Sequence, residues 1–513
     1  MKRFRKNLIL FAAGVCAACL VALAYPHISD SIKKRLADKS VFFGHSGKNL
    51  GWGNALEATA RQNNKLIFLV VNGHEFKPDD KFKKLLDEYF YVVDFDQYKW
   101  PADYMVLQNI YERATGNARE FSAAILLPRL APLFITSELS GDSNSPIAAA
   151  AFALAEKFSE NPAATRTLAK ALPEILANPP AMESADINGL PDGAIAWDIE
   201  GIRLNDFFSK DTSKYFTAVL AENGRLAARI YYLSPKFDAA FAAALKAQVV
   251  LIKRLNDSPP LLDRLIIARA LFEIAILADS RGYSEPLVKF ADSIVDMIHT
   301  DGRMIENSRH SITGENALGV QVLTLAYAYT RDEKYLDAAK KIGEHLEILL
   351  KTFSQMPSDA DVGTASQSSS WTYVFTAKAF GNLHYMTGDR RYIILCRLLF
   401  DAWDKLFMTK DGIWSANSYS SPTANVVRPI EFEDSRLPSY TGEAAQIIEY
   451  LKRADPTFDA PYGDKIKAIS LYMLRHFNFN EYSTASWKLS QVPDISQRHI
   501  GATQNSRAIS RVP

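Results

Sequence analysis

The sequence predicts a chain in two parts, an α/β domain followed by a larger all-α domain. Residues 40–145 alternate short apolar runs of strand length with helical stretches. Residues 160–490 place apolar side chains at helical spacing and show scarcely any strand-like alternation. The length of 513 residues suffices for two or three domains. We assign residues 1–30 to a signal peptide or membrane anchor and residues 491–513 to a polar tail.

The charges of the chain are balanced, which excludes some classes of function. Lys and Arg number 59, and Asp and Glu number 58, with no dense basic cluster beyond the first six residues. We expect no nucleic-acid partner, because phosphate recognition requires a basic face. The three cysteines are Cys16, Cys19 and Cys396, so the folded part can form no internal disulfide and no cysteine-bound metal site. The common metal and phosphate-loop motifs are also missing, so we expect neither a metal nor a cofactor.

The N-terminus has the order of an export signal. Basic residues precede an uncharged run, Asn7 to Ile28, whose apolar centre is Leu8 to Ala24. Either cleavage follows Ala24, or the run stays as a membrane anchor with its basic flank in the cytoplasm. Cys16 and Cys19 belong to this run, where no fold lowers a thiol pKa. The sequence therefore predicts a cell-envelope protein, either anchored in the inner membrane and facing the periplasm, or secreted.

The elements of residues 40–145 are expected in the order helix, strand, helix, strand, helix, strand, strand. Lys65–Val71 is a continuous apolar run, as in strands that are buried on both faces of a sheet. This order with short connections is typical of a thioredoxin-like domain. The expected helices cover residues 54–64, 79–89 and 102–115, and the other strands cover 91–96, 122–127 and 132–137.

This domain resembles the thioredoxin-like domain of the spermatogenesis-associated protein 20 type, which in bacteria is joined to a helical toroid. The resemblance is spread along the domain and rests on no single motif. The matching positions are Trp52, Ala55-Leu56, Ala58, Asn64 to Leu69, Val93 to Asp96, Pro101, Tyr104, Thr115-Gly116 and Pro128.

The redox site of that family is missing. Where the family has a cysteine-rich motif after the first core strand, this chain has Asn72-Gly73-His74-Glu75. The Trp-Pro pair at the family's third strand, the place of a cis-proline in thioredoxin-like domains, reads Phe121-Ser122. Thiol–disulfide exchange needs a thiolate, so we predict a redox-inactive domain. His74 and Glu75 are either a replacement site or, more simply, a solvated turn.

Residues 160–490 repeat a two-helix unit. Thr330-Arg-Asp-Glu-Lys-Tyr335 recurs 57 positions later as Thr387-Gly-Asp-Arg-Arg-Tyr392. A period of about 55 residues holds two helices with their loops, and about six such periods fit this range. Six hairpins close an (α/α)6 toroid, in which the apolar flank of every hairpin is buried. Asp332 and Asp389 are then helix caps rather than catalytic residues.

The helical part resembles the same family at Asp301-Gly302-Arg303 and Pro438 to Ala445, although Glu315-Asn316-Ala317 stands where the family often has Asp-Tyr-Ala. The family's toroid is similar to those of N-acylglucosamine 2-epimerases and several glycoside hydrolases, which bind sugars in a funnel formed by the inner helices. The resemblance therefore implies a six-hairpin glycosidase-like fold and a saccharide ligand.

Loops that precede the inner helices are expected to line the funnel. Glycoside hydrolysis uses two carboxyl groups, and epimerisation uses acid and base groups on both faces of the sugar. The acids near residue 431 could equally form a solvated loop, and the aromatic residues could equally belong to the core. The candidate catalytic acids are Glu315, Glu431, Glu433 and Asp434. The candidate ligand-binding residues are Arg309, His310, Trp371, Tyr373, Trp414, Arg436 and Tyr440.

Three functions remain open from the sequence. The first is an exported, membrane-tethered protein whose toroid binds a saccharide or peptide without turnover. The second is a carbohydrate-active enzyme, either a glycoside hydrolase or a sugar epimerase. The third is a non-catalytic scaffold for protein partners. Two facing carboxylates in the funnel would favour the enzyme, and a funnel filled by side chains would favour the scaffold.

Overall fold

The computed structural model describes residues 52–165 and 197–491, apart from short internal gaps and most of residues 456–481. The expected N-terminal signal or anchor and the tail beyond Gln491 lie outside these residues. Within the described ranges no helix is long and apolar enough to cross a membrane. The chain divides into an α/β unit, residues 1–179 and 419–429, and a helical unit, residues 180–418 and 430–513.

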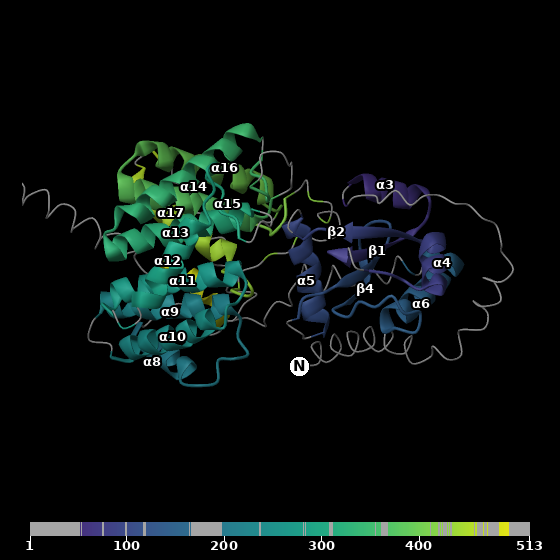
Figure 1. Ribbon diagram of the computed structural model, residues 1–513, viewed down its shortest axis with the longest axis horizontal. Coiled ribbons are helices and arrows are strands. Elements are labelled where there is room, and N and C mark those ends of the chain that lie inside the picture. Colours follow the sequence, from purple (N-terminus) through teal and green to yellow (C-terminus); the bar gives the residue numbers. More distant parts are fainter. Residues whose placement is uncertain are drawn as a thin grey trace, which may run out of the picture. The chain divides into compact units, whose positions relative to one another are not determined.

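The α/β unit contains a mixed sheet of four strands in the order β2-β1-β3-β4 (Figure 1). The strands β1 and β2 run parallel, with Leu66 opposite Phe90, whereas β3 is antiparallel to both β1 and β4. The strands expected from the sequence are therefore present. Their bounds are β1 Leu66–Val71, β2 Phe90–Phe95, β3 Ala123–Leu126 and β4 Pro132–Thr136.

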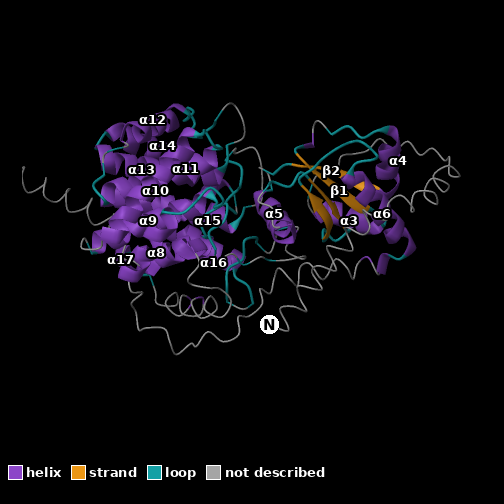
Figure 2. Ribbon diagram, turned by 90° about the horizontal axis from the view of Figure 1, so that it is seen from below, coloured by secondary structure: helices purple, strands orange, loops and turns teal. Residues whose placement is uncertain are grey.

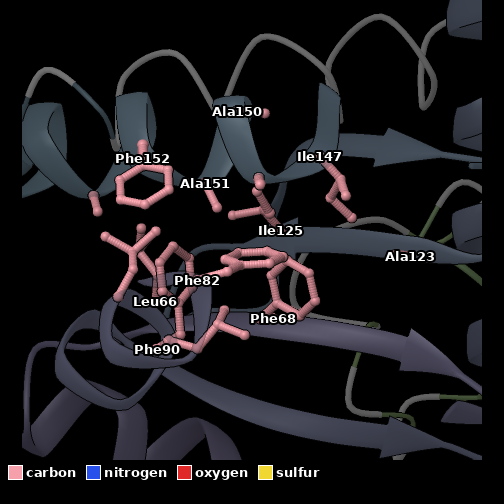
Figure 3. Packing of buried hydrophobic residues seen from close by; sticks show 14 of the residues in the cluster. Leu66, Phe68, Phe82, Phe90, Ala123, Ile125, Ile147, Ala150, Ala151 and Phe152 are labelled. Carbon is pink, nitrogen blue, oxygen red and sulfur yellow. The ribbon is translucent and has the colours of Figure 1, made fainter. Parts of the chain in front are cut away.

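Two layers of helices bury both faces of this sheet. Alternate side chains of β1 point to opposite faces, so that Phe68 packs with helices α4 and α6 (Figure 3) and Leu69 packs with α3 and α5. The continuous apolar run is explained by this burial on both sides. The helices are α3 Asn54–Gln62, α4 Asp80–Tyr89, α5 Pro101–Thr115 and α6 Pro146–Glu160.

Among the described residues, six inner helices of the helical unit form a closed ring, and outer helices pack against them. Figure 2 shows that this unit consists of helices and the loops that join them, in contrast to the sheet of the α/β unit. Each inner helix packs against the next, and the last packs against the first. The inner helices are α9 Thr217–Leu233, α11 Leu261–Leu277, α13 Thr313–Thr330, α15 Ser370–Thr387, α17 Tyr440–Ala454 and α19 Ala485–Gln491. The described outer helices are α8 Trp197–Phe208, α10 Asp238–Asn256, α12 Ser284–Asp296, α14 Glu333–Thr352 and α16 Arg390–Phe407.

The repeated Thr-x-Asp-x-x-Tyr turns join an inner helix to the following outer helix, and their predicted capping role is confirmed. The Asp332 carboxylate accepts a hydrogen bond from the second amide of α14, and Asp389 does the same at α16. The preceding residue in each turn is left-handed, with φ of 65° at Arg331 and 72° at Gly388. These turns are therefore architectural.

Candidate functional site

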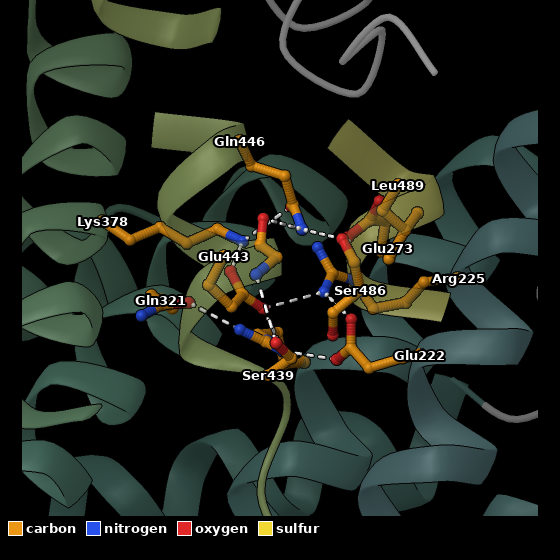
Figure 4. Close-up of polar contacts among 12 residues, drawn as sticks. Glu222, Arg225, Glu273, Gln321, Lys378, Ser439, Glu443, Gln446, Ser486 and Leu489 are labelled. Atoms are coloured by element: carbon orange, nitrogen blue, oxygen red, sulfur yellow. Dashed lines mark hydrogen bonds and ion pairs between the residues drawn. The ribbon is translucent and has the colours of Figure 1, made fainter. Parts of the chain in front are cut away.

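The interior of the ring holds a network of charged and amide side chains (Figure 4). Each inner helix turns one stripe inward, and polar residues recur on that stripe at spacings of three or four. The helix α19 contributes through main-chain carbonyls, with Ser486 O accepting from Gln446 Nε2 at 3.1 Å. The side chains are Glu222, Arg225 and Arg229 from α9, Arg269 and Glu273 from α11, Gln321 from α13, Lys378 from α15, and Glu443 and Gln446 from α17.

Every carboxylate of this network is paired with at least one arginine. Arg225 binds Glu273 through Nε at 2.7 Å and Glu443 through Nη1 at 3.3 Å. Burial opposes ionisation of Glu273, but Arg225 and Arg229 lower its pKa to about 2. Burial likewise opposes ionisation of Glu443, whose pKa is nevertheless held below its usual value by Arg269, Lys378 and Arg225. The arrangement satisfies the rule that buried charges must be paired.

Lys378 is the network residue that reaches nearest to solvent, with 13% of its side chain exposed. Its ammonium binds Glu443 and lies 3.0 Å from the Gln446 side-chain oxygen. Burial lowers its pKa to about 8, and Glu443 only partly offsets this because Arg225 and Arg269 lie nearby. The carboxylates and arginines of the network occupy the interior of the ring with side chains that are only 0–3% exposed.

Asp434 has a structural position beside the network. Its carboxyl group accepts hydrogen bonds from the amides of Ser439 at 2.8 Å and Ser486 at 2.9 Å. These amides belong to the starts of α17 and α19, so Asp434 joins two inner helices. Burial and the nearby Glu222 raise its pKa well above the usual value. Its carboxyl is fully covered.

A different pair of acids, Glu306 and Glu315, lies near the N-terminal end of α13, with Arg264 of α11 beside them. Glu315, in the first turn of α13, is partly exposed. Glu306, in the loop that leads to α13, forms an ion pair with Arg264 from the first turn of α11. The side chain of Glu306 is 30% exposed and that of Arg264 is 19% exposed. Burial and the charge of Glu306 raise the pKa of Glu315 to about 7, although Arg264 acts in the opposite direction.

Trp371, in the first turn of α15, lies against the start of α13. A Cβ atom on Gly314 would be 2.1 Å from the Trp371 ring, so only glycine allows this approach. The Trp371 indole N–H and the Thr313 hydroxyl are buried and have no hydrogen-bond partner among the described residues. Phe375 lies one turn further along α15, with its ring centre 4.8 Å from that of Trp371, and its ring faces Arg269 of the network. We refer to Glu315, Glu306, Arg264, Trp371 and Thr313 as the α13 site.

The other aromatic candidates pack in the core, which is the second of the two alternatives that the sequence left open. Tyr373 is buried, accepts a hydrogen bond from the Met356 amide, and has its pKa raised by burial to about 12. Trp414 and Tyr440 are buried together, and the Tyr440 hydroxyl donates to the Trp414 carbonyl at 3.2 Å. Aromatic residues also fill the layer between inner and outer helices, and the sequence alone does not settle which of them do so.

Two further candidates are partly exposed near the start of α17. Glu433 accepts a hydrogen bond from the Ser483 hydroxyl at 3.1 Å, and Arg436 faces the Phe216 ring at 5.9 Å. Arg309, His310 and Glu431 lie outside the described residues, as do His74 and Glu75 of the α/β unit. Sequence reasoning missed Glu306 and Arg264. Each of them lies close to the start of an inner helix, but many other charged residues do so as well, and this position alone does not single them out.

No protein-family model matches the sequence, and neither does any curated protein. Solved structures with a similar arrangement include a D-mannose isomerase, at 13% identity and a TM-score of 0.44, over 61% of this chain and 100% of that one. The GH76 α-mannanase BT2949 of Bacteroides thetaiotaomicron is similar at 12% identity and a TM-score of 0.43, over 60% and 96%. The unsaturated glucuronyl hydrolase of Bacillus sp. GL1 is similar at 12% identity and a TM-score of 0.39, over 54% of this chain and 81% of that one. Similarity at this level assigns no activity to this chain.

Proposed function

We propose that the helical unit is a carbohydrate-active enzyme of the acid–base type, with Glu315 as the acid and Glu306 as the base or nucleophile. The observation that carries this proposal is the difference between the two environments. Glu315, with a pKa of about 7, retains a proton near neutral pH, whereas Glu306 is ion-paired with Arg264. A carboxyl group that holds a proton near neutral pH, beside a second carboxyl group in an ion pair, is an arrangement suited to acid–base catalysis.

In glycoside hydrolysis each group would have a distinct task. Glu315 would donate its proton to the oxygen of the leaving sugar, and Glu306 would activate water or attack the anomeric carbon. Arg264 would hold the Glu306 carboxylate in place through their ion pair. The Trp371 N–H and the Thr313 hydroxyl, which have no partner among the described residues, are hydrogen-bonding groups of the kind that bind a hydroxyl-rich ligand. A sugar epimerase would use the same acid and base on a carbon-bound proton.

The test is an activity screen of the full chain against oligosaccharides, with detection of new reducing ends and of interconverted monosaccharides. For any substrate that is turned over, Glu315→Gln and Glu306→Gln should each lower kcat by roughly 100-fold or more. Glu344→Gln changes an exposed glutamate of α14 and should leave kcat unchanged. Full activity in Glu315→Gln would refute the assignment.

A non-catalytic function is the second candidate, and it is favoured by the filled interior of the ring. A ring closed by buried ion pairs leaves its rim as the surface for a saccharide, peptide or protein partner. Glycan-array binding without turnover would support a saccharide-binding protein. Absence of both turnover and glycan binding would support the protein-interaction scaffold.

For the α/β unit we propose a redox-inactive thioredoxin-like domain of the spermatogenesis-associated protein 20 type. The sheet order with one parallel pair supports this, as does the lack of any cysteine between Cys19 and Cys396. The full chain should then fail to accelerate the reduction of insulin by dithiothreitol.

Export to the cell envelope remains a proposal that rests on the N-terminal sequence. Cell fractionation combined with N-terminal sequencing of the mature protein would separate the membrane-anchored form from the form cleaved after Ala24.

A further inference from the structure

The α/β unit contains a buried carboxylate that has no part in the proposed reaction. Asp103 lies in the first turn of α5 and is 1% exposed. Because α5 follows β2, and β2 runs parallel to β1, Asp103 lies at the edge where both strands have their carboxyl ends. This is the edge at which open α/β sheets bind their ligands.

One oxygen of this carboxylate is fixed from within the unit. Asp103 Oδ2 accepts a hydrogen bond from the Trp52 indole at 2.9 Å. Trp52 is itself buried and meets Phe95, the last residue of β2, edge to face at 4.9 Å between ring centres. The packing of Trp52 therefore orients the carboxylate independently of residues 419–429.

The other oxygen holds part of residues 419–429, which belong to the α/β unit although they are distant in sequence. Asp103 Oδ1 accepts hydrogen bonds from the hydroxyls of Ser421 and Thr423 and from the Thr423 amide at 3.2 Å. The two hydroxyls lie 3.1 Å apart, and both residues are buried. The carboxylate thus has three donors from two residues of one segment.

Charge and sequence both favour this contact. Burial raises the pKa of Asp103, and the hydrogen bonds from Ser421, Thr423 and Trp52 act against that rise. A carboxylate this deeply buried is costly unless such donors are present. The residue between the two donors is Pro422, which biases Ser421 towards extended backbone and so lowers the entropy lost on binding.

We propose that this edge of the α/β unit is a peptide-binding site anchored by Asp103, and that its ligand is the Ser421-Pro422-Thr423 segment of the same chain. The ligand recognised is an extended peptide with hydroxyl side chains at positions i and i+2 and a backbone N–H that donates at position i+2. The segment continues at both ends into the helical unit, at Ser418 and Ile430. The α/β unit then serves to hold this segment in place.

Hydrogen exchange of the full chain tests the anchor. In Asp103→Ala, peptides that cover residues 417–430 should exchange at least tenfold faster than in the unchanged protein, while peptides from α9 should not change. Asp87→Ala, which alters a carboxylate that is 65% exposed in the same unit, is the matched control and should match the unchanged protein. Equal protection of residues 417–430 in Asp103→Ala would overturn the proposal.

A second variant keeps the test valid if Asp103→Ala does not fold. Ser421→Ala/Thr423→Val keeps Asp103 and removes its hydroxyl donors. A fluorescein-labelled peptide of residues 417–430 should bind this double variant in trans, and the same peptide carrying both substitutions should bind at least tenfold more weakly. Equal binding of the two peptides, or no binding of either, would show that Asp103 does not recognise the segment.

Discussion

Glu443 is the residue of the inner network whose change should have the largest effect on stability. Its carboxylate pairs with three cations, namely Arg225 at 3.3 Å, Arg269 at 2.8 Å and Lys378. Glu443→Gln keeps the shape of the side chain and one acceptor oxygen but removes the charge. Arg225, Arg269 and Lys378 then each lose an ionised partner, and the network keeps an excess of buried positive charge.

The expected cost is about 3–5 kcal/mol, the range for removing one partner of a buried ion pair. For a unit of this size, such a change lowers Tm by roughly 10 °C. Urea denaturation followed by circular dichroism at 222 nm reports the loss, since the helical unit supplies most of the helix. The pKa of Lys378 should also fall below about 8, because Glu443 is the group that raises it.

The control for this experiment lies on the same helix. Glu449, in the same α17, pairs with Lys452 at 2.8 Å, and both side chains are well exposed. Glu449→Gln should change the free energy of unfolding by no more than about 0.5 kcal/mol. If Glu443→Gln were equally mild, the network would not stabilise the ring, and the reasoning from buried charge would be wrong.

Three further substitutions test other contacts. Glu315→Gln should raise the free energy of unfolding at pH 8 by up to about 3 kcal/mol and leave it unchanged at pH 4. The sign follows because folding raises this pKa from 4.5 to about 7, so ionisation opposes folding as pH rises through that window. Asp389→Ala should cost about 1 kcal/mol in a urea titration by removing the α16 cap; no change would contradict the cap. Gly314→Ala should cost about 1–3 kcal/mol through its clash with Trp371, whereas Gly282→Ala, with no atom within 4 Å of its added carbon, should not.

The strands and most helices could be predicted because their signals are local. Leu66–Val71 is apolar at every position, as burial on both faces of a sheet requires, and Asp79 caps α4 through the Phe82 amide as its position suggests. The Thr-x-Asp-x-x-Tyr repeat likewise locates two hairpins of the ring. In each case the residues that decide the structure are neighbours in the chain.

The network and the α13 site could not be predicted because their partners are remote. Arg225 and Glu443 are 218 residues apart, and Arg264 and Glu306 are 42 apart. On a single helix, Glu222 and Arg225 resemble an ordinary surface pair at i, i+3. Only closure of the ring turns such residues inward, and that closure depends on all six inner helices at once.

The contrast between these two groups of charges indicates where chemistry is to be sought. In the network each carboxylate is buried and paired with arginine, so a ligand has no access to it. At the α13 site one carboxyl lies near another, both are partly exposed, and two buried donors have no partner among the described residues. A buried polar network whose members are satisfied makes the core rigid, whereas an accessible carboxyl group with a shifted pKa can exchange a proton with a substrate. Phe375 connects the two groups, because its ring contacts Trp371 of the α13 site on one side and faces Arg269 of the network on the other.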